Sequence, residues 1–145
     1  RMPARGEIDP VDLGRLLSWV SLIGIQRPAL RFVFRIVASQ ISDGFGARRG
    51  KGLEEMRSRN YSEALVRVWR SVAETGAPRL DRFELTIRKR SFRCWHASFP
   101  LGENDVEPNM ILVGSDFERQ SQELLINAFN HAVEMEALRR KRRRD

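Results

Sequence analysis

The stretch that decides the fold is "NYSEALVRVWRSVAETGAPRLDRFELTIRKR", residues 60–90, because its hydrophobic period changes partway along. Apolar residues in the first half recur every three or four positions, from Leu65 to Val72, which predicts an amphipathic helix. Gly76 can end this helix, and Pro78 prevents it from resuming. Beyond Pro78 apolar and polar residues alternate, which predicts a half-exposed strand joined to the helix by Gly-Ala-Pro.

The segments before this helix predict a hairpin. "SWVSLIGIQ" (18–26) is short and apolar, and "LRFVFRIVASQ" (30–40) alternates. The alternation is expected to turn one set inward and the other outward: Phe32, Phe34, Ile36 and Ala38 against Arg31, Val33, Arg35 and Val37. Asp9 and Pro10 form a helix start signal ahead of the hairpin. The glycines of residues 41–56 fit neither a P-loop nor a dinucleotide fingerprint, so an irregular connection is expected there.

Two further strands and a helix are expected after the deciding stretch. The strands are "SFRCWHASFPL" (91–101) and "EPNMILVGSDF" (107–117), and the helix runs through residues 118–138. On the first strand we expect Trp95, Ala97, Phe99 and Leu101 to face inward, and Cys94, His96 and Ser98 outward. The predicted fold is α+β: a five-stranded antiparallel sheet with helices on one face, plus a C-terminal helix. That helix carries a narrow seam, which fits either pairing with a second helix or packing on the chain's own sheet: Leu125, Ala128, Ala132 and Met135.

Four phrases resemble a bacterial family of small, mostly stand-alone PAS-like proteins: "PARGEIDPVDLGRLL", "RFVFRIVAS", "VRVWRSVAETGAP" and "PLGENDVEPNMILVG". The resemblance implies a PAS-like domain over residues 1–117, an output or dimerisation helix over 118–138 and a basic tail over 139–145. It also implies that the long helix and the strands after Pro78 enclose the space where PAS domains hold ligands. Such domains act as sensors or docking modules.

The apolar side chains expected inside either line a ligand pocket or fill a packed core, and both interpretations stay open. They are Phe34, Ile36, Trp69, Val72, Phe83, Trp95, Phe99 and Met110. No haem motif is found, because the long helix contains no histidine, and Cys94 lacks the context of light-sensing flavin proteins. Two histidines and one cysteine do not give zinc-ligand spacing, so the sequence assigns no metal, and the identity of any cofactor is left unknown.

No catalytic constellation is recognisable. The sequence has no nucleophile elbow and no cysteine with an activating histidine at a familiar spacing. Asp9 and Asp12 are better explained by helix capping than by acid–base catalysis. The chain is therefore expected not to be an enzyme; a small-molecule enzyme of similar α+β shape is the alternative.

The charge is concentrated in the tail. The formal net charge is +7, of which residues 139–145 supply +5 and leave +2 for the rest. The six basic residues either stay solvated or bind nucleic acid or an anionic membrane: Arg139, Arg140, Lys141, Arg142, Arg143 and Arg144. A nucleic-acid-associated regulator is thus a further alternative function.

The expected setting is the cytosol, because the chain has one cysteine and no apolar run of transmembrane length. Val33 and Val37 on the outward sheet face, together with the seam of the C-terminal helix, predict a homodimer. The sequence therefore favours a dimeric, non-enzymatic PAS-type sensory or protein-interaction module that contacts a partner in bacterial signalling.

Overall fold

Five strands form one sheet in the order β2-β1-β5-β4-β3, and every neighbouring pair is antiparallel. The computed structural model describes residues 1–39, 46–87, 89–117 and Lys141. Its elements are η1 (Arg5–Glu7), α1 (Pro10–Leu13), η2 (Gly14–Trp19), β1 (Val20–Gln26), β2 (Arg31–Ile36), η3 (Leu53–Glu55), α3 (Arg59–Thr75), β3 (Arg79–Ile87), β4 (Arg90–Leu101) and β5 (Met110–Phe117). The predicted C-terminal helix, its seam and the tail other than Lys141 lie outside the described residues.

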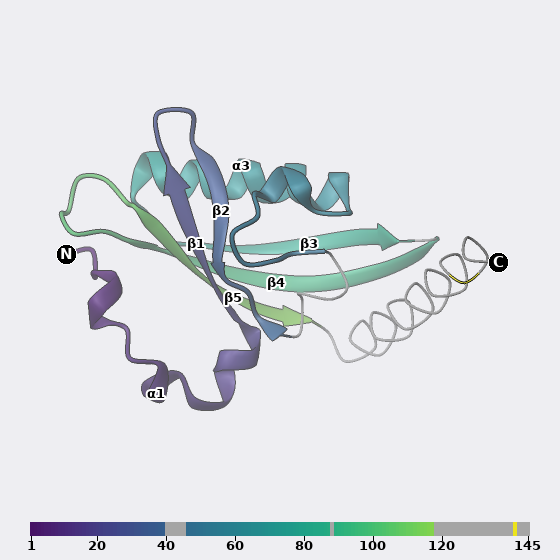
Figure 1. Cartoon of the computed structure of the whole chain (residues 1–145), viewed down its shortest axis with the longest axis horizontal. Coiled ribbons are helices and arrows are strands. Elements are labelled where there is room, and N and C mark those ends of the chain that lie inside the picture. The colour runs from purple at the N-terminus through teal and green to yellow at the C-terminus, as the bar shows by residue number, and fades with distance from the viewer. Residues whose placement is uncertain (40–45, 88, 118–140, 142–145) are drawn as a thin grey trace.

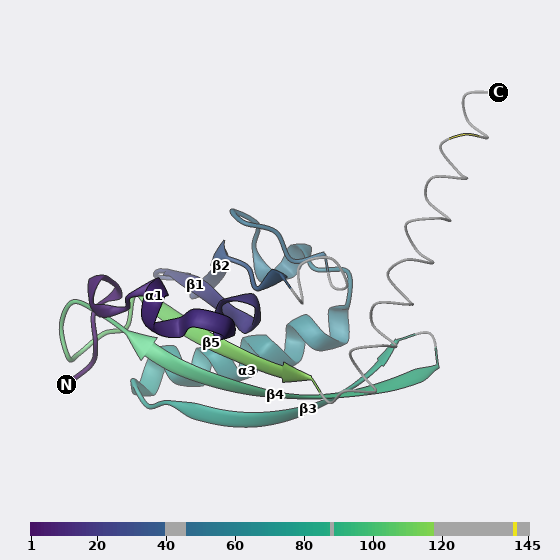
Figure 2. The ribbon, with the colours of Figure 1, turned by 90° about the horizontal axis from the view of Figure 1, so that it is seen from below.

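The long helix α3 lies along one face of this sheet (Figure 1). Strands β3, β4 and β5 follow one another as a meander, and the β1–β2 hairpin adds beside β5. The hairpin crosses β3 and β4 steeply in Figure 1, and Figure 2 shows β3 and β4 as a long curved pair. This architecture confirms the predicted α+β fold.

The two ends of α3 are set by the residues that the sequence indicated. At its start, the Ser58 side chain accepts a hydrogen bond from the Tyr61 backbone N–H at 3.3 Å. At its end, Gly76 adopts a left-handed conformation with φ of 65°, and its N–H donates to the Val72 carbonyl. The apolar stripe between these ends is buried against the sheet: Tyr61, Leu65, Val68, Trp69, Val72 and Ala73.

Replacing Gly76 with alanine is expected to lower the free energy of unfolding by about 1 kcal/mol, because a Cβ disfavours the left-handed region. Space is not the cause, since the nearest atom to an added Cβ is the Met2 Cε at 3.5 Å. Urea unfolding with an unchanged m-value would measure the loss. Gly6→Ala is the control, because no atom lies within 4 Å of its added Cβ and its φ is not positive. Equal stability of the two variants would contradict the conformational explanation.

The prediction for β4 was wrong for the larger part of the strand, because its two faces are exchanged from Cys94 to Phe99; Leu101 at its end is buried, as expected. Cys94, His96 and Ser98 are at most 1% exposed and point toward α3. Trp95 and Phe99 are 41% and 47% exposed on the opposite, outer face. Register explains the exchange, since Cys94 pairs with the core residue Phe83, and Ser98 pairs with the core residue Val113.

The prediction for Ile36 was also wrong. Ile23 pairs with Phe34, but Leu22, the residue before it in β1, pairs with Ile36, so Arg35 is left without a partner in the register. The additional residue in β2 makes a bulge, which moves Ile36 to the outer face and leaves it 48% exposed.

The two valines predicted to form an outward dimer surface are not free to do so. Val33 is 3% exposed, and the β2 edge beside it is bridged by Gly52. Val37 is partly buried and packs against the core.

Candidate functional site

A group of polar side chains lies buried between α3 and the inner face of the sheet. Tyr61, in the first turn of α3, places its hydroxyl oxygen 2.7 Å from Nε2 of His96 on β4. Ser115 on β5 pairs directly with His96, and Ser98 lies two residues further along β4. With Cys94, which the Tyr61 hydroxyl also contacts, these residues form what we call the polar cluster.

Aromatic packing fixes the orientation of the Tyr61 and His96 rings. Phe83 lies beside both, with ring centroids 4.9 Å from His96 and 6.0 Å from Tyr61. The Tyr61 and His96 rings meet edge to face at 5.7 Å. Such tilted contacts stabilise aromatic pairs beyond the area they bury, so the hydrogen bond between the two rings is held in place.

Burial keeps the titratable members of the polar cluster uncharged at neutral pH. It raises the pKa of Tyr61 well above its ordinary value and raises the pKa of Cys94 to about 12. The Asp116 carboxylate adds to the upward shift of the Cys94 pKa, and the hydrogen bond between Cys94 and Tyr61 opposes it. Burial lowers the pKa of His96 to about 4, against the opposing effect of the Asp81 carboxylate. A protonated thiol is a poor nucleophile, so Cys94 is not activated for nucleophilic attack at neutral pH.

Several buried polar atoms have no hydrogen-bond partner among the described residues. They are Nδ1 of His96, Oγ of Ser98, Oγ of Ser115 and Nε1 of Trp69. Buried polar groups are hydrogen-bonded in the great majority of cases, to protein or to ordered water. Three of the four atoms belong to the polar cluster, which makes it the candidate ligand site.

The predicted pocket residues are divided by the sheet. Four of them lie in the core beneath α3: Phe34, Trp69, Val72 and Phe83. The Trp69 ring meets Phe34 edge to face at 6.2 Å. The other four lie at outer positions: Ile36, Trp95 and Phe99 are exposed, and Met110 is partly buried opposite Leu101.

The polar cluster itself was missed, although one signal for it was present. Tyr61 lies four residues before Leu65, on the apolar stripe of the predicted helix. A buried tyrosine usually finds a hydrogen-bond partner for its hydroxyl, so a polar group on the facing sheet was to be expected. The identity of that group depended on which face of β4 turns inward, which alternation does not tell.

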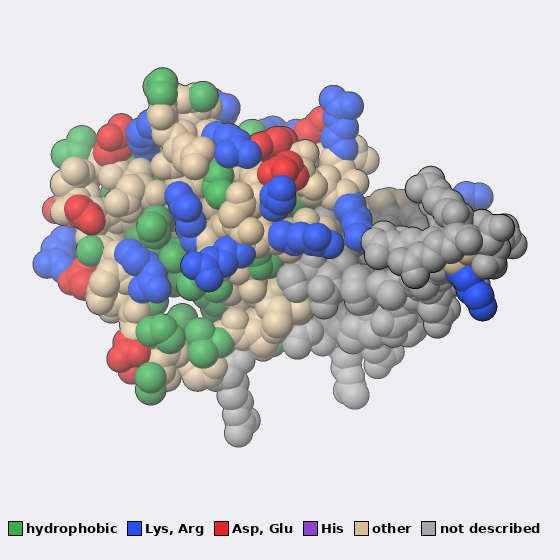
Figure 3. Space-filling view, in the orientation of Figure 1, with side chains coloured by type: hydrophobic (Ala, Val, Ile, Leu, Met, Phe, Trp, Pro, Cys, Tyr) green, Lys and Arg blue, Asp and Glu red, His purple; other side chains and the backbone are tan. Residues whose placement is uncertain are grey.

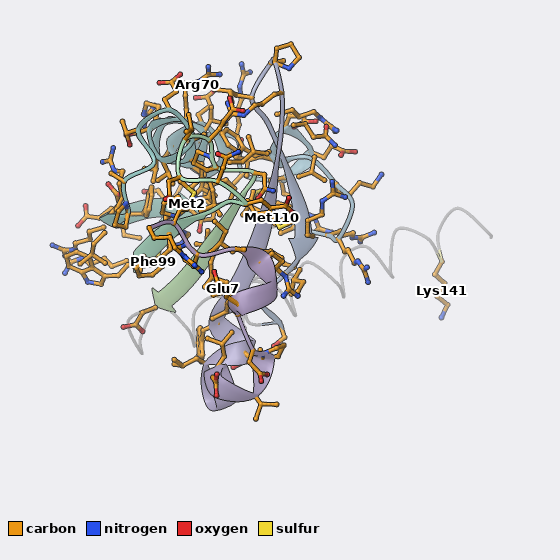
Figure 4. The ribbon with its side chains drawn as sticks, turned by 90° about the vertical axis from the view of Figure 1, so that its left-hand side faces the viewer. Met2, Glu7, Arg70, Phe99, Met110 and Lys141 are labelled. Atoms are coloured by element: carbon orange, nitrogen blue, oxygen red, sulfur yellow. The ribbon has the colours of Figure 1, made fainter. Side chains whose placement is uncertain are left out.

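The outer face of the sheet carries a second feature, an apolar band that crosses all five strands. The pairing runs from Leu80 to Ala97, from Phe99 to Leu112, from Leu112 to Leu22 and from Leu22 to Ile36. We call this set, with Trp95, the outer apolar band. Figure 4 shows Phe99 on the side of the molecule away from the β1–β2 hairpin. Figure 3 presents the side that carries the hairpin, where basic side chains lie among hydrophobic ones. Beyond Phe99 the Pro3 carbonyl accepts a hydrogen bond from the Gly102 N–H, so the N-terminal segment covers that end of β4.

The described residues contain no group of three histidine, cysteine or acidic side chains placed to hold a metal ion. Within the same ranges, no helix has the length and apolar character needed to cross a bilayer. The basic tail residues lie outside the described part of the chain except for Lys141, which is exposed.

The chain matches no protein family and no curated protein by sequence. Among solved structures it is similar to the PAS domain of BvgS from Bordetella pertussis, with a TM-score of 0.53 and 17% identity. That match covers 89% of this chain and 99% of the BvgS domain. The LOV protein of Rhodobacter sphaeroides is similar over 70% of this chain and 60% of its own length, with a TM-score of 0.48 and 13% identity. The predicted PAS-like fold is confirmed.

Proposed function

We propose that this chain is a non-enzymatic PAS-type sensory and protein-interaction module of bacterial signal transduction, acting in the cytosol as a homodimer. The observation that carries this proposal is the outer apolar band. Single exposed apolar residues are ordinary, but several on one sheet face indicate an interaction surface. On the β3–β4 side of the band, Leu80, Trp95 and Phe99 are 68%, 41% and 47% exposed, whereas Leu22 in the middle of the band is buried. A sheet face can meet its own copy about a two-fold axis, since an isologous interface needs only one self-complementary surface.

The sensory part of the proposal rests on how β4 alternates between its two faces. His96 lies between Trp95 and Ala97 in the chain, and Ser98 lies between Ala97 and Phe99. Members of the polar cluster and of the outer apolar band are therefore covalent neighbours. A displacement of the inner side chains of β4 moves the backbone that carries the interface, which is the coupling that a sensor requires.

Replacing Phe99 with glutamate is expected to weaken the homodimer by about thirtyfold or more, because central aromatic anchors commonly contribute about 2 kcal/mol or more to an interface. Phe99 is exposed, so the folded monomer should tolerate the change. Native mass spectrometry across a concentration series would measure the dissociation constant.

Val106→Glu is the matched control, because Val106 is highly exposed in the loop between β4 and β5, outside the outer apolar band. Its dimer is expected to match that of the unaltered chain. A monomeric unaltered chain, or a Phe99→Glu dimer of unchanged affinity, would refute the proposed interface.

The neutral polar cluster supports the non-enzymatic part of the proposal, because it offers no ionised nucleophile at neutral pH. Nucleic-acid binding by residues 139–144 stays a prediction from the sequence.

A further inference from the structure

We propose that the polar cluster binds a small uncharged molecule of a few heavy atoms that carries both a hydrogen-bond donor and an acceptor, such as a primary amide. The inference rests on the proposed sensory function and deepens it by naming the chemical class of ligand. It is carried by three buried polar atoms without a described partner: Nδ1 of His96, Oγ of Ser98 and Oγ of Ser115.

The spacing of these residues sets the size of the ligand. His96 and Ser115 are directly paired on antiparallel strands, so their Cβ atoms lie about 5 Å apart. Ser98 lies two residues along the same strand as His96, roughly 7 Å away on the same face. We therefore infer a ligand of about four heavy atoms, because a larger one would have to displace the packed rings of Tyr61 and Phe83.

The surroundings favour a ligand without charge. The buried polar residues of the described chain are all neutral side chains: Ser21, Ser62, His96, Ser98 and Ser115. The carboxylate nearest in register to His96 is that of Asp81, and both of its oxygens already accept from Arg79, at 2.7 and 3.2 Å. No lysine, arginine, aspartate or glutamate is buried among the described residues, so a charged ligand would meet no buried counter-ion there, and burying an unpaired charge is costly.

The hydrogen-bonding capacity of the polar cluster calls for both a donor and an acceptor. When the Tyr61 hydroxyl donates to Nε2, the neutral ring of His96 carries its proton on Nδ1, which then donates. The hydroxyls of Ser98 and Ser115 each donate and accept. A carbonyl oxygen can accept from the imidazole while the N–H groups of the same amide donate to the serine hydroxyls.

Acetamide and acetate provide the test, because they have nearly the same shape and differ in charge. The full chain contains only two histidines, His96 and His131, so imidazole ¹⁵N labelling gives two sets of signals, and His96→Gln identifies those of His96. We expect acetamide to shift the Nδ1 signal of His96 saturably, with a Kd of about 1 mM for a ligand of this size. Acetate is expected to give no saturable shift at neutral pH.

Serine variants show whether the ligand occupies the polar cluster. Ser115→Ala should weaken acetamide binding about fivefold, the ordinary effect of one lost hydrogen bond. Ser62→Ala is the matched control, because Ser62 is also buried but its hydroxyl already donates to the Arg59 carbonyl. Should Ser115→Ala fail to fold, Ser98→Ala makes the same test.

The absence of an acetamide shift, acetate binding of equal strength, or equal weakening in Ser62→Ala would each overturn the proposal. The monomeric Phe99→Glu variant should still bind acetamide. Native mass spectrometry reports on the dimer, and the Nδ1 signal of His96 reports on the ligand. Failure of one proposal is therefore distinguishable from failure of the other.

Discussion

Replacing Trp69 with alanine is expected to lower the free energy of unfolding by about 3–5 kcal/mol, because it removes a large side chain from a closed part of the core. Trp69 is 2% exposed, and its ring meets Phe32 and Phe34 edge to face at 6.0 and 6.2 Å. A loss of this size is a large share of the roughly 5–15 kcal/mol that stabilises a typical domain. Urea unfolding followed by circular dichroism would measure it.

Trp95→Ala is the matched control for this experiment, since it makes the same substitution on the exposed outer face of β4. Both changes are best measured in the Phe99→Glu background, so that dimer dissociation does not contribute. We expect the Trp95 variant to lose about 1 kcal/mol or less, in line with surface substitutions. Equal losses at the two positions would contradict the assignment of Trp69 to the interior and Trp95 to the outer face.

Acid is expected to destabilise the fold by about 3 kcal/mol between pH 6.5 and pH 4 through His96 alone. In the unfolded chain this imidazole takes up a proton near pH 6.5, whereas in the folded chain burial lowers its pKa to about 4. Between these values unfolding binds a proton, so the stabilising contribution is complete above pH 6.5 and is lost as the pH falls.

The pH dependence is measured by urea unfolding at steps of pH, comparing the unaltered chain with His96→Gln. The variant should lose most of the slope between pH 6.5 and pH 4, while His131→Gln should keep it. Carboxylates also titrate toward the lower end of this range, so the difference between the variants is the quantity that reports on His96. Parallel curves for the unaltered chain and His96→Gln would show that the imidazole is not buried in neutral form.

Most of the fold was predictable because each element leaves a local mark. The change of period at Gly76 and Pro78, the alternation in β2 and β4 and the cap at Asp9 each depend on a few neighbouring residues. These signals placed every described strand within a few residues of its observed bounds. The bulge in β2 left no such mark, because it arises from pairing with β1.

The candidate site was less predictable, because alternation separates two faces without saying which one the helix covers. On β4 the larger apolar side chains, Trp95 and Phe99, pointed to the wrong face, since the outer face of this sheet is itself apolar. The inner face carries Cys94, His96 and Ser98, which the sequence pattern alone classes as polar or small. Only the register with Phe83 and Val113 assigns them to the interior.

The pairing at the end of β5 has a practical consequence for reporter design. Phe117 pairs with Cys94, and Ser115 pairs with His96. A segment joined to Phe117 is therefore covalently connected to the sheet within two residues of the polar cluster. A fluorescent protein or a split-enzyme fragment fused after Phe117 would thus be attached at the end of β5, two residues from Ser115 of the polar cluster. Such a chimera is expected to report ligand occupancy without any redesign of the interior.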